Sequence, residues 1–268
     1  MQKTEIEKYL KTQDFGRNLI CLNKTESTNF DVKKAAADGC AHGYTVVAEE
    51  QTAGRGRLDH SWHSPAGINI YMSILLKPRA TMSCFPQIPV ICAIALHQAL
   101  TGMAYSPKLG LKWPNDLLTA DNLQKISGIL CEGVTMKDRS PAIVIGIGIN
   151  VNSLQDDFSD DLRVRATSLK MATGRNWCRE QVLAEFLNSF ETVFNEWQEA
   201  ASLRPFMDYW IRHDLLAGRE ISILQDGKTE KGRACGLDDE GRLLLETDDG
   251  MKMIHAGDVH LQTTFPDR

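Results

Sequence analysis

The run Ile-Val-Ile-Gly-Ile-Gly-Ile at residues 143–149 constrains the fold more than any other part of the chain. Residues that are all β-branched or glycine predict a strand, and the lack of polar side chains predicts that both faces of the strand are covered. Residues 69–76 are nearly as apolar. We therefore expect a sheet with these two segments at its centre and further strands at residues 19–22 and 45–48.

Helices are expected where apolar residues recur at helical spacing, as they do through residues 179–200 and, in a buried helix, through residues 89–100. Thr28 and Asp31 have the spacing of a capping box, so a further helix should begin at Thr28 and stop at Gly39. The remaining helices are shorter, at residues 4–11 and 206–216. Helices and strands that do not alternate regularly indicate the α+β class.

The chain changes character near residues 213–218. Beyond them, short β-prone segments are separated by turn dipeptides. The segments are residues 221–224, 231–237, 243–246, 251–254 and 259–261, and the turns are Asp226-Gly227, Glu240-Gly241 and Asp249-Gly250. This pattern predicts a small β-barrel, and hence two domains at residues 1–214 and 215–268.

Composition excludes several classes of protein. A formal charge of −5 gives no electrostatic reason to bind nucleic acid, so we expect no DNA partner. Seven scattered cysteines without a Cys-x-x-Cys pair indicate reduced core residues, not disulfides or a zinc site. We expect no apolar run near the roughly 20 residues that span a bilayer, and therefore a cytoplasmic protein without a membrane partner.

Two polar segments, residues 49–67 and 112–128, are interpreted as the loops that carry function. In the first, Gly-Arg-Gly-Arg at residues 54–57 combines exposed backbone N–H groups with guanidinium forks, which suits an anionic nucleotide. An ordinary basic hairpin would have the same letters, so this motif alone is weak.

The second segment contains Lys-Trp-Pro-Asn-Asp at residues 112–116 and then Lys125. The Asn-Asp pair could hold Mg²⁺ through oxygen atoms, and either lysine could neutralise phosphate or carboxylate charge. A surface turn is the alternative interpretation. Gly146 and Gly148 would let a flat ligand lie against the sheet, but Val151 stands where a dinucleotide fingerprint needs glycine.

Five segments in order resemble the biotin-protein ligase family, in its form without an N-terminal DNA-binding domain. They are Glu-Ser-Thr-Asn (26–29), Glu-Gln-Thr-Ala-Gly-Arg-Gly-Arg (50–57) with Trp62, Lys-Trp-Pro-Asn-Asp (112–116), Lys-Ile-Ser-Gly-Ile-Leu (125–130) and Gly-Ile-Gly-Ile-Asn (146–150). The likeness spans roughly residues 20–262.

The resemblance implies a class II aminoacyl-tRNA synthetase-like catalytic domain with a mixed, largely antiparallel sheet, followed by an SH3-like β-barrel. It also implies an enzyme that uses ATP and Mg²⁺ to convert biotin to biotinyl-5′-AMP. The biotin then passes to a lysine of a biotin carboxyl carrier protein. The acceptor carboxylase and the presence of a homodimer stay open.

Carried over residue by residue, the resemblance implies a biotin site, an ATP site and a metal site. Biotin would be bound by Ser27, Thr28, Asn29, Gln51, Gly54, Arg55, Gly56, Arg57, Lys125 and Gly128. ATP would be bound by Arg55, Arg57, Trp62, Lys112, Asn115, Asp116, Lys125 and Asn150. The catalytic residues would be Lys125, Arg57, Lys112 and Asp116, with Mg²⁺ on Asn115 and Asp116. Many relatives carry a further glycine and arginine after the loop, where this chain has Leu-Asp-His-Ser at residues 58–61, so no phosphate contact is expected from His60.

The chemistry of the two steps differs. The carboxylate of biotin is ionised at neutral pH, so its attack on the α-phosphate needs positioning and charge neutralisation but no general base. The acceptor lysine must lose a proton before it attacks the mixed anhydride, and Asp116 is the candidate to assist that loss.

Three other functions are weighed against this one. A lipoate ligase or octanoyl transferase of the same superfamily would lack the Gly-Arg-Gly-Arg loop followed by Lys-Trp-Pro-Asn-Asp. A DNA-binding regulator would need more than the about 20 residues that precede the expected catalytic domain. A non-catalytic biotin-binding regulator would not need Lys112, Asn115, Asp116 and Lys125 together.

Overall fold

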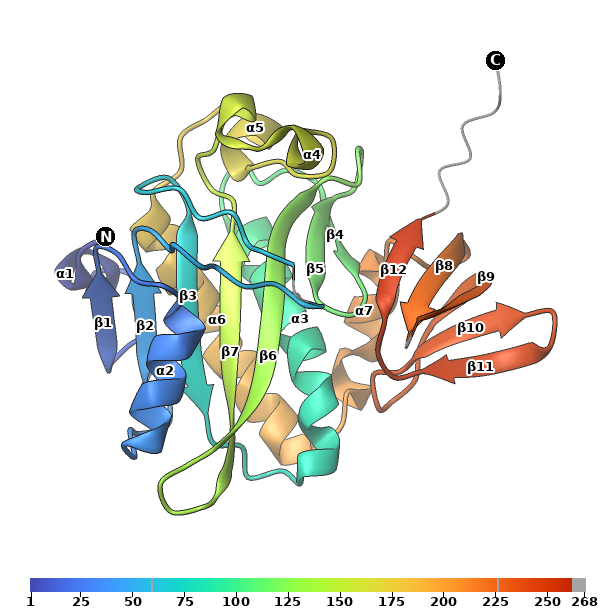
Figure 1. The fold of residues 1–268 in the computed structure, drawn as a ribbon, viewed down its shortest axis with the longest axis horizontal. Coiled ribbons are helices and arrows are strands. Elements are labelled where there is room, and N and C mark those ends of the chain that lie inside the picture. Colours follow the sequence, from blue (N-terminus) through green and yellow to red (C-terminus); the bar gives the residue numbers. More distant parts are fainter. Residues whose placement is uncertain (59, 226, 262–268) are drawn as a thin grey trace.

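The computed structural model describes residues 1–58, 60–225 and 227–261. A seven-stranded sheet with helices on both faces lies beside a five-stranded sheet (Figure 1). In the larger sheet only the first pair of strands is parallel, and every other pair is antiparallel. In spatial order its strands are β1 (Leu19–Leu22), β2 (Thr45–Ala48), β3 (Ile70–Leu76), β7 (Pro141–Ile149), β6 (Lys125–Thr135), β5 (Asp116–Thr119) and β4 (Leu109–Lys112).

The two apolar segments lie at the centre of this sheet, as predicted. Every residue of β3 is buried, and β7 pairs with β3 on one side and β6 on the other. Helices α3 (Ile88–Gly102) and α6 (Arg179–Ala200) cover the back of the sheet in Figure 1, and α2 (Thr28–Ala37) lies across the front. Covering both faces removes apolar surface from water on each side, which is why the central strands carry no polar alternation.

The core behind the sheet is rich in aromatic side chains on one stripe of α6. Phe190 stacks against Phe186 at 5.5 Å between ring centroids, and Phe15, from the segment before β1, stacks on Phe190 at 5.2 Å. Glu191 accepts hydrogen bonds from the backbone N–H groups of Gln13, Asp14 and Phe15, at 2.7, 2.7 and 3.0 Å. The N-terminal segment, which includes α1 (Lys3–Glu7), is thus fastened to α6.

One stretch corrects the expectation about apolar runs. The 3₁₀ helix η1 (Met82–Gln87) and α3 together form Met82–Gly102, a helix long and apolar enough to cross a membrane by length and composition. Uncharged polar residues divide this stretch into shorter apolar runs, so the sequence alone did not show how long the apolar helix is. Most of the stretch is buried inside the protein, as expected for a core helix.

Three local expectations were also wrong. Ser27, and not Thr28, is the N-cap residue of α2, and Asp31 accepts a hydrogen bond from the Thr25 hydroxyl at 2.7 Å instead of closing a capping box. Residues 112–128 contain the last residue of β4, all of β5 and the start of β6, because Lys112 and Asp116 pair on one face of a hairpin whose other face buries Leu111 and Leu117. Cys178 and Cys235 are exposed, since they lie at a helix end and on the outer face of a strand.

The smaller sheet is antiparallel and has the order β11-β10-β9-β8-β12. Its strands are β8 (Glu220–Gln225), β9 (Lys228–Leu237), β10 (Leu243–Thr247), β11 (Gly250–Ile254) and β12 (Asp258–Leu261). Gly241 and Gly250 turn the chain with positive φ of 82° and 107°. The turn at Asp226-Gly227 falls partly outside the described residues. Within the described ranges no hydrogen bonds pair β11 with β12, so the sheet is open where a closed barrel was expected.

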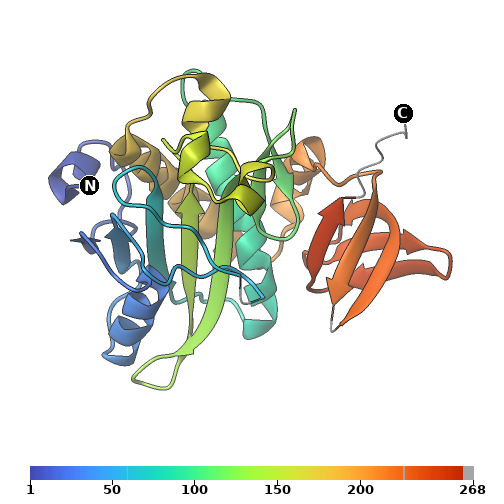
Figure 2. The same ribbon diagram turned by 45° about the horizontal axis from the view of Figure 1, so that its top comes forward.

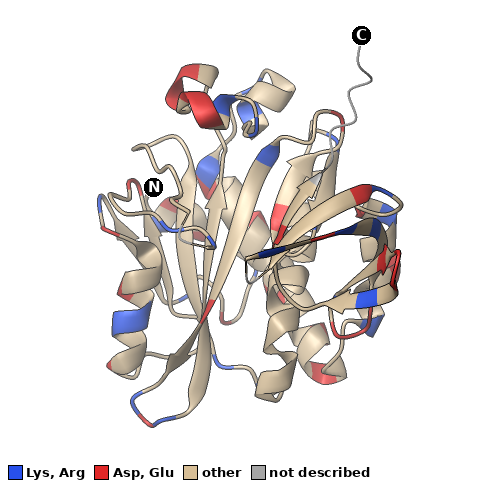
Figure 3. Cartoon of the chain, turned by 45° about the vertical axis from the view of Figure 1, so that its right-hand side comes forward, with Lys and Arg blue, Asp and Glu red and all other residues tan. Residues whose placement is uncertain are grey.

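Short helices connect these parts. They are η2 (Gln155–Asp157), α4 (Asp160–Arg163), α5 (Leu169–Thr173), η3 (Arg204–Phe206) and α7 (Met207–His213). The chain leaves α7 and enters β8 across residues 214–219. The two sheets also touch directly, because the indole Nε1 of Trp113 donates a hydrogen bond to the carbonyl of Gly241 at 2.9 Å. Figure 3 shows charges of both signs on the smaller sheet.

Candidate active site

A cavity of about 650 Å³ opens on the face of the large sheet that α2 covers. Its floor is made by residues of β6 and β7, including Gly128 and Gly148. The loop that contains residues 51–58 and 60–64 crosses in front of these strands, and the segment at residues 158–166, which contains α4, lies over their ends (Figure 2). The two predicted motif segments and the sheet glycines therefore meet in one place.

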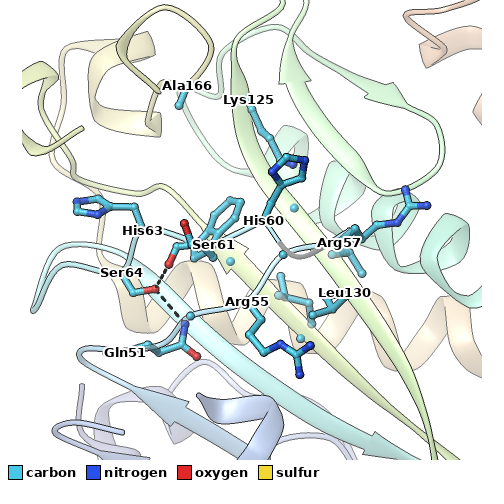
Figure 4. A pocket seen from close by; sticks show the side chains of 18 of the residues that line it. Gln51, Arg55, Arg57, His60, Ser61, His63, Ser64, Lys125, Leu130 and Ala166 are labelled. Atoms are coloured by element: carbon cyan, nitrogen blue, oxygen red, sulfur yellow. Dashed lines mark hydrogen bonds between the residues drawn. The ribbon is translucent and has the colours of Figure 1, made fainter. Parts of the chain in front are cut away.

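One end of the cavity is polar but uncharged. Gln51 Oε1 accepts hydrogen bonds from the backbone N–H of Thr28 at 2.9 Å and from its hydroxyl at 3.1 Å. Gln51 Nε2 donates to Ser64 Oγ at 3.0 Å (Figure 4). Ser73 Oγ lies 2.7 Å from Thr28 Oγ1 and 2.5 Å from Asn29 Oδ1. Such a network can bind a neutral polar ring and reject ligands that leave its groups unpaired.

The glycines of the floor make room for side chains above the sheet. A Cβ atom at Gly148 would lie 2.2 Å from Trp62, one at Gly128 would lie 2.9 Å from Lys125 and 3.0 Å from Trp62, and one at Gly146 would lie 2.1 Å from Asn29 Oδ1. The indole Nε1 of Trp62 is buried and has no hydrogen-bond partner within the described ranges. The surface predicted to receive a flat ligand is thus covered by Trp62 at Gly148 and by Asn29 at Gly146.

The other end of the cavity is charged. Lys125 Nζ lies 2.6 Å from Asp116 Oδ1, and Lys112 Nζ lies 3.8 Å from Asp116 Oδ2. The sheet register sets this arrangement, because Asp116 pairs with Lys112 on β4 and with Gly128 on β6. Lys125 Nζ also lies 5.6 Å from the centroid of the Trp62 ring, within range of a cation–π interaction.

Arg57 adds a partly buried cation to this end. Its Nη1 donates to Asn115 Oδ1 at 3.0 Å, and Asn115 Nδ2 donates to the carbonyl of Ile129 at 2.7 Å. Burial lowers the pKa of Arg57 and of Lys112, although the negative charge of Asp116 opposes both shifts. Positive groups that burial disfavours are stabilised by an added anion, so the charged end suits phosphate or carboxylate.

The residues present suit Mg²⁺ in part. Asp116 Oδ1 is buried and accepts no hydrogen bond among the described residues, with only the ion pair to Lys125 beside it. A single carboxylate together with phosphate oxygens and water is a usual arrangement for this ion. Asn115 is less suited, because its amide oxygen and nitrogen are already engaged by Arg57 and Ile129. No group of three His, Cys, Asp or Glu side chains suited to a metal occurs among residues that the structure describes.

Nearly all of the predicted site residues line this cavity. They are Ser27, Thr28, Asn29, Gln51, Gly54, Arg55, Gly56, Arg57, Trp62, Asn115, Asp116, Lys125, Gly128 and Asn150. Lys112 is the exception, since it lies behind Asp116 and its side chain is only 15% exposed. His60 lines the cavity as well.

Sequence reasoning missed several residues of the lining. Ser64, Phe158, Arg165 and Asp258 carry no motif, and only the fold brings them here. The segment at residues 158–166 is held by backbone pairing, as Lys125 N–H donates to the carbonyl of Arg165 at 2.8 Å. Asp258 comes from the smaller sheet, at the first residue of β12.

Comparison with known proteins identifies the family. Residues 20–150 match the model of the biotin/lipoate A/B protein ligase family, and residues 217–261 match the biotin protein ligase C-terminal domain. The chain is 37% identical to the bifunctional ligase/repressor BirA of Bacillus spizizenii, covering 97% of this chain and 79% of that protein. It is 33% identical to the biotin–[acetyl-CoA-carboxylase] ligase of Paracoccus denitrificans, covering 89% and 98%.

A solved structure agrees with these matches. The biotin protein ligase from Aquifex aeolicus in complex with biotin and ATP superposes with a TM-score of 0.80 at 31% identity, covering 92% of this chain and 99% of that one. The ligase motifs, the cavity that unites them and these matches lead to one conclusion: the chain belongs to the biotin-protein ligase family.

Proposed function

We propose that this protein joins biotin to ATP to form biotinyl-5′-AMP and then transfers biotin to a lysine of a carrier protein. The observation that carries the proposal is the division of one cavity into an uncharged polar end at Thr28 and Gln51 and a cationic end at Arg57 and Lys125. Biotin has a neutral polar ring and a carboxylate, and ATP brings the phosphates. The two ends suit the two ends of the adenylate.

In the first step a carboxylate oxygen of biotin attacks the α-phosphorus of ATP, and pyrophosphate leaves. The residues at the cationic end neutralise the charge that gathers between two anions, which is electrostatic stabilisation by fixed groups. Mg²⁺, when bound, would screen the phosphate oxygens beside Asp116. Lys125 contacts the reacting groups, and Arg57 closes the loop over them. Lys112 holds Asp116 in place from behind.

In the second step the amine of the acceptor lysine attacks the carbonyl carbon, AMP leaves, and the nitrogen loses a proton. Asp116, the carboxylate that lies against Lys125, could accept or relay this proton. A variant at Asp116 that forms adenylate at a normal rate and fails in transfer would support this role. Equal damage to both steps would remove it.

Lipoate ligation is the competing activity, because the matched family model covers both kinds of ligase. The match of residues 217–261 to the biotin protein ligase C-terminal domain favours biotin. Biotin-dependent exchange of pyrophosphate into ATP tests the choice. We expect exchange with biotin and none with lipoate. The reverse result would show that the protein is a lipoate ligase.

The acceptor and the location follow from the same proposal. We propose that the acceptor is the biotin carboxyl carrier domain of a carboxylase and that the reaction takes place in the cytoplasm. Related ligases are named for acetyl-CoA carboxylase, which favours a carrier of that kind. Incubation with a purified carrier domain should add one biotin to a single lysine.

A further inference from the structure

We propose that Glu132 is a positioning residue that connects the loop carrying Arg55 to Asn29 at the uncharged end of the cavity. Glu132 is on β6 and does not line the cavity itself. Its Oε2 accepts a hydrogen bond from Asn29 Nδ2 at 2.7 Å, and its Oε1 lies 3.7 Å from Arg55 Nη1. One carboxylate therefore contacts both the loop and the first turn of α2.

The carboxylate is held in its ionised form. Burial by itself disfavours the charge, but a hydrogen bond from Lys33 Nζ at 2.5 Å, together with the one from Asn29, outweighs burial and lowers the pKa of Glu132. The side chain of Glu132 is 19% exposed. A fixed negative charge of this kind orients the donors around it at neutral pH.

Asn29 has little freedom to point elsewhere. Its amide nitrogen donates to Glu132, its amide oxygen is bonded to Ser73, and that oxygen occupies the space left by the missing side chain of Gly146. Ser73 in turn lies against Thr28, whose hydroxyl donates to Gln51. The orientation that Glu132 imposes on Asn29 therefore belongs to the network at the uncharged end.

Arg55 is the most exposed residue of this connection. Its side chain is 56% exposed, and Glu132 is its acidic partner within 4 Å in the described part of the chain. In Figure 4 the side chains of Arg55 and Arg57 leave the loop in different directions. Arg57 reaches Asn115 beneath the charged end, so the two arginines fasten the loop at separate points. Loss of the Arg55 contact should loosen the loop while Arg57 still holds it.

The inference rests on the proposed function for its kinetic test, which is a double-mutant cycle of Glu132→Gln and Arg55→Gln. The probe is biotinyl-5′-AMP bound to the purified protein, and the rate constant of its release is measured. Each single change should speed release about two- to five-fold, the effect of a half-exposed ion pair. The double variant should release the adenylate more slowly than the product of the two single effects predicts, because the contact between Glu132 and Arg55 that both changes remove is lost only once.

Hydrogen exchange of the backbone amides of residues 54–58 gives a second readout that needs no ligand. Exchange there should rise in Glu132→Gln and in Arg55→Gln to the same extent. The matched control is Glu230→Gln, which breaks the 2.7 Å ion pair with Lys252 in the smaller sheet and should change neither readout.

The role of Glu132 would be overturned if the effects of the two substitutions on the release rate multiplied in the double variant. Unchanged hydrogen exchange at residues 54–58 would overturn it as well. Failure of the unsubstituted protein to form or bind the adenylate would instead refute the proposed function. In that case the exchange measurement would still decide whether Glu132 positions the loop.

Discussion

Among single residues, the charged end of the cavity depends on an excess of positive side chains over negative ones. Asp116 lies between Lys112 and Lys125, while Arg57 is bonded to a neutral amide. The positive charge in excess of Asp116 remains for the substrates, inside a cavity where its interactions are stronger than in water. The individual cations can therefore be tested for different parts of the reaction.

Changing Lys125 to Ala should lower the rate of adenylate formation by a factor on the order of 10² to 10³. This is the usual effect of deleting one group that stabilises developing charge. The side chain is partly exposed, so the fold should persist, and biotin should still bind through Thr28 and Gln51. Pyrophosphate exchange and biotin titration measure the two effects. Lys24→Ala, which breaks a surface pair with Glu50, is the control. Near-normal exchange in a folded Lys125→Ala protein would mean that the catalytic cation is elsewhere.

Changing Arg57 to Gly should separate formation of the adenylate from its retention. The substitution removes the 3.0 Å bond to Asn115 and the charge that the loop offers to phosphate. Loss of charge-assisted hydrogen bonds costs roughly 1.5 to 3 kcal/mol, about ten- to a hundred-fold in affinity, mostly as faster release. Stopped-flow release and mass spectrometry of labelled bystander lysines check the result. Release and selectivity equal to those of the unsubstituted protein would contradict the role given to Arg57.

At the scale of elements, the site depends on close approach between the loop and the sheet. A methyl group at Gly148 would overlap Trp62 at 2.2 Å. Gly148→Ala should therefore displace the indole and weaken binding of biotin and ATP about five- to a hundred-fold, in line with about 1 to 3 kcal/mol for overpacking. Gly133→Ala on β6 is the matched control, because a Cβ atom there meets nothing within 4 Å. Equal Michaelis constants in both variants would show that Trp62 does not shape the site.

The sequence predicts the central strands well because β7 carries no polar side chain and β3 carries only one strongly polar side chain, that of Ser73. The hairpin of β4 and β5 was missed because some of its residues lie in the core and others line or support the charged end of the cavity. Leu111 and Leu117 are buried, whereas Lys112 and Asp116 stand at the charged end of the cavity. The charged residues that the site requires therefore made the sequence of β4 and β5 resemble that of a loop.

The site was predictable to the extent that its residues belong to motifs. The resemblance to a known family supplied most of the lining, from Ser27 to Asn150. Phe158, Arg165 and Asp258 could not be found in this way, since each reaches the cavity through packing between distant segments. Glu132 gave no signal either, because its role depends on three partners that lie far apart in the chain.

At the scale of the whole molecule, the smaller sheet is attached to the larger one and also contributes to the cavity. Trp113 bonds to Gly241, and Asp258 lines the charged end. Asp258 is also one of the carboxylates that oppose the lowering of the pKa of Arg57 and Lys112 by burial. The C-terminal segment is therefore part of the active unit and not an appendage.

Stability should depend on pH through His97, which is buried between α3, β4 and α7. Leu109 O can only accept, so Nε2 of His97 donates to it at 3.1 Å and Nδ1 accepts from Tyr209 Oη at 2.6 Å. Burial above all lowers the pKa of His97 to about 4, from 6.5 in an exposed histidine. The unfolded chain therefore binds a proton first as pH falls.

This contribution to stability is complete above about pH 6.5 and is lost as pH falls towards about 4, at up to about 1.4 kcal/mol per pH unit. Urea unfolding of the unsubstituted protein and of His97→Gln at several pH values isolates the effect. The difference in unfolding free energy should shrink between pH 7 and pH 4.5. Parallel curves would show that His97 does not titrate as its burial requires.

Native mass spectrometry of the protein with biotin and Mg·ATP shows whether one cavity makes and holds a biotinyl adenylate. We expect a mass increase equal to one biotinyl-5′-AMP per chain, which should be absent when lipoate replaces biotin. The adduct should disappear when a biotin carboxyl carrier domain is added, as that domain gains one biotin. A protein that carries no adduct, or that carries a lipoyl adenylate equally well, would contradict this role of the cavity.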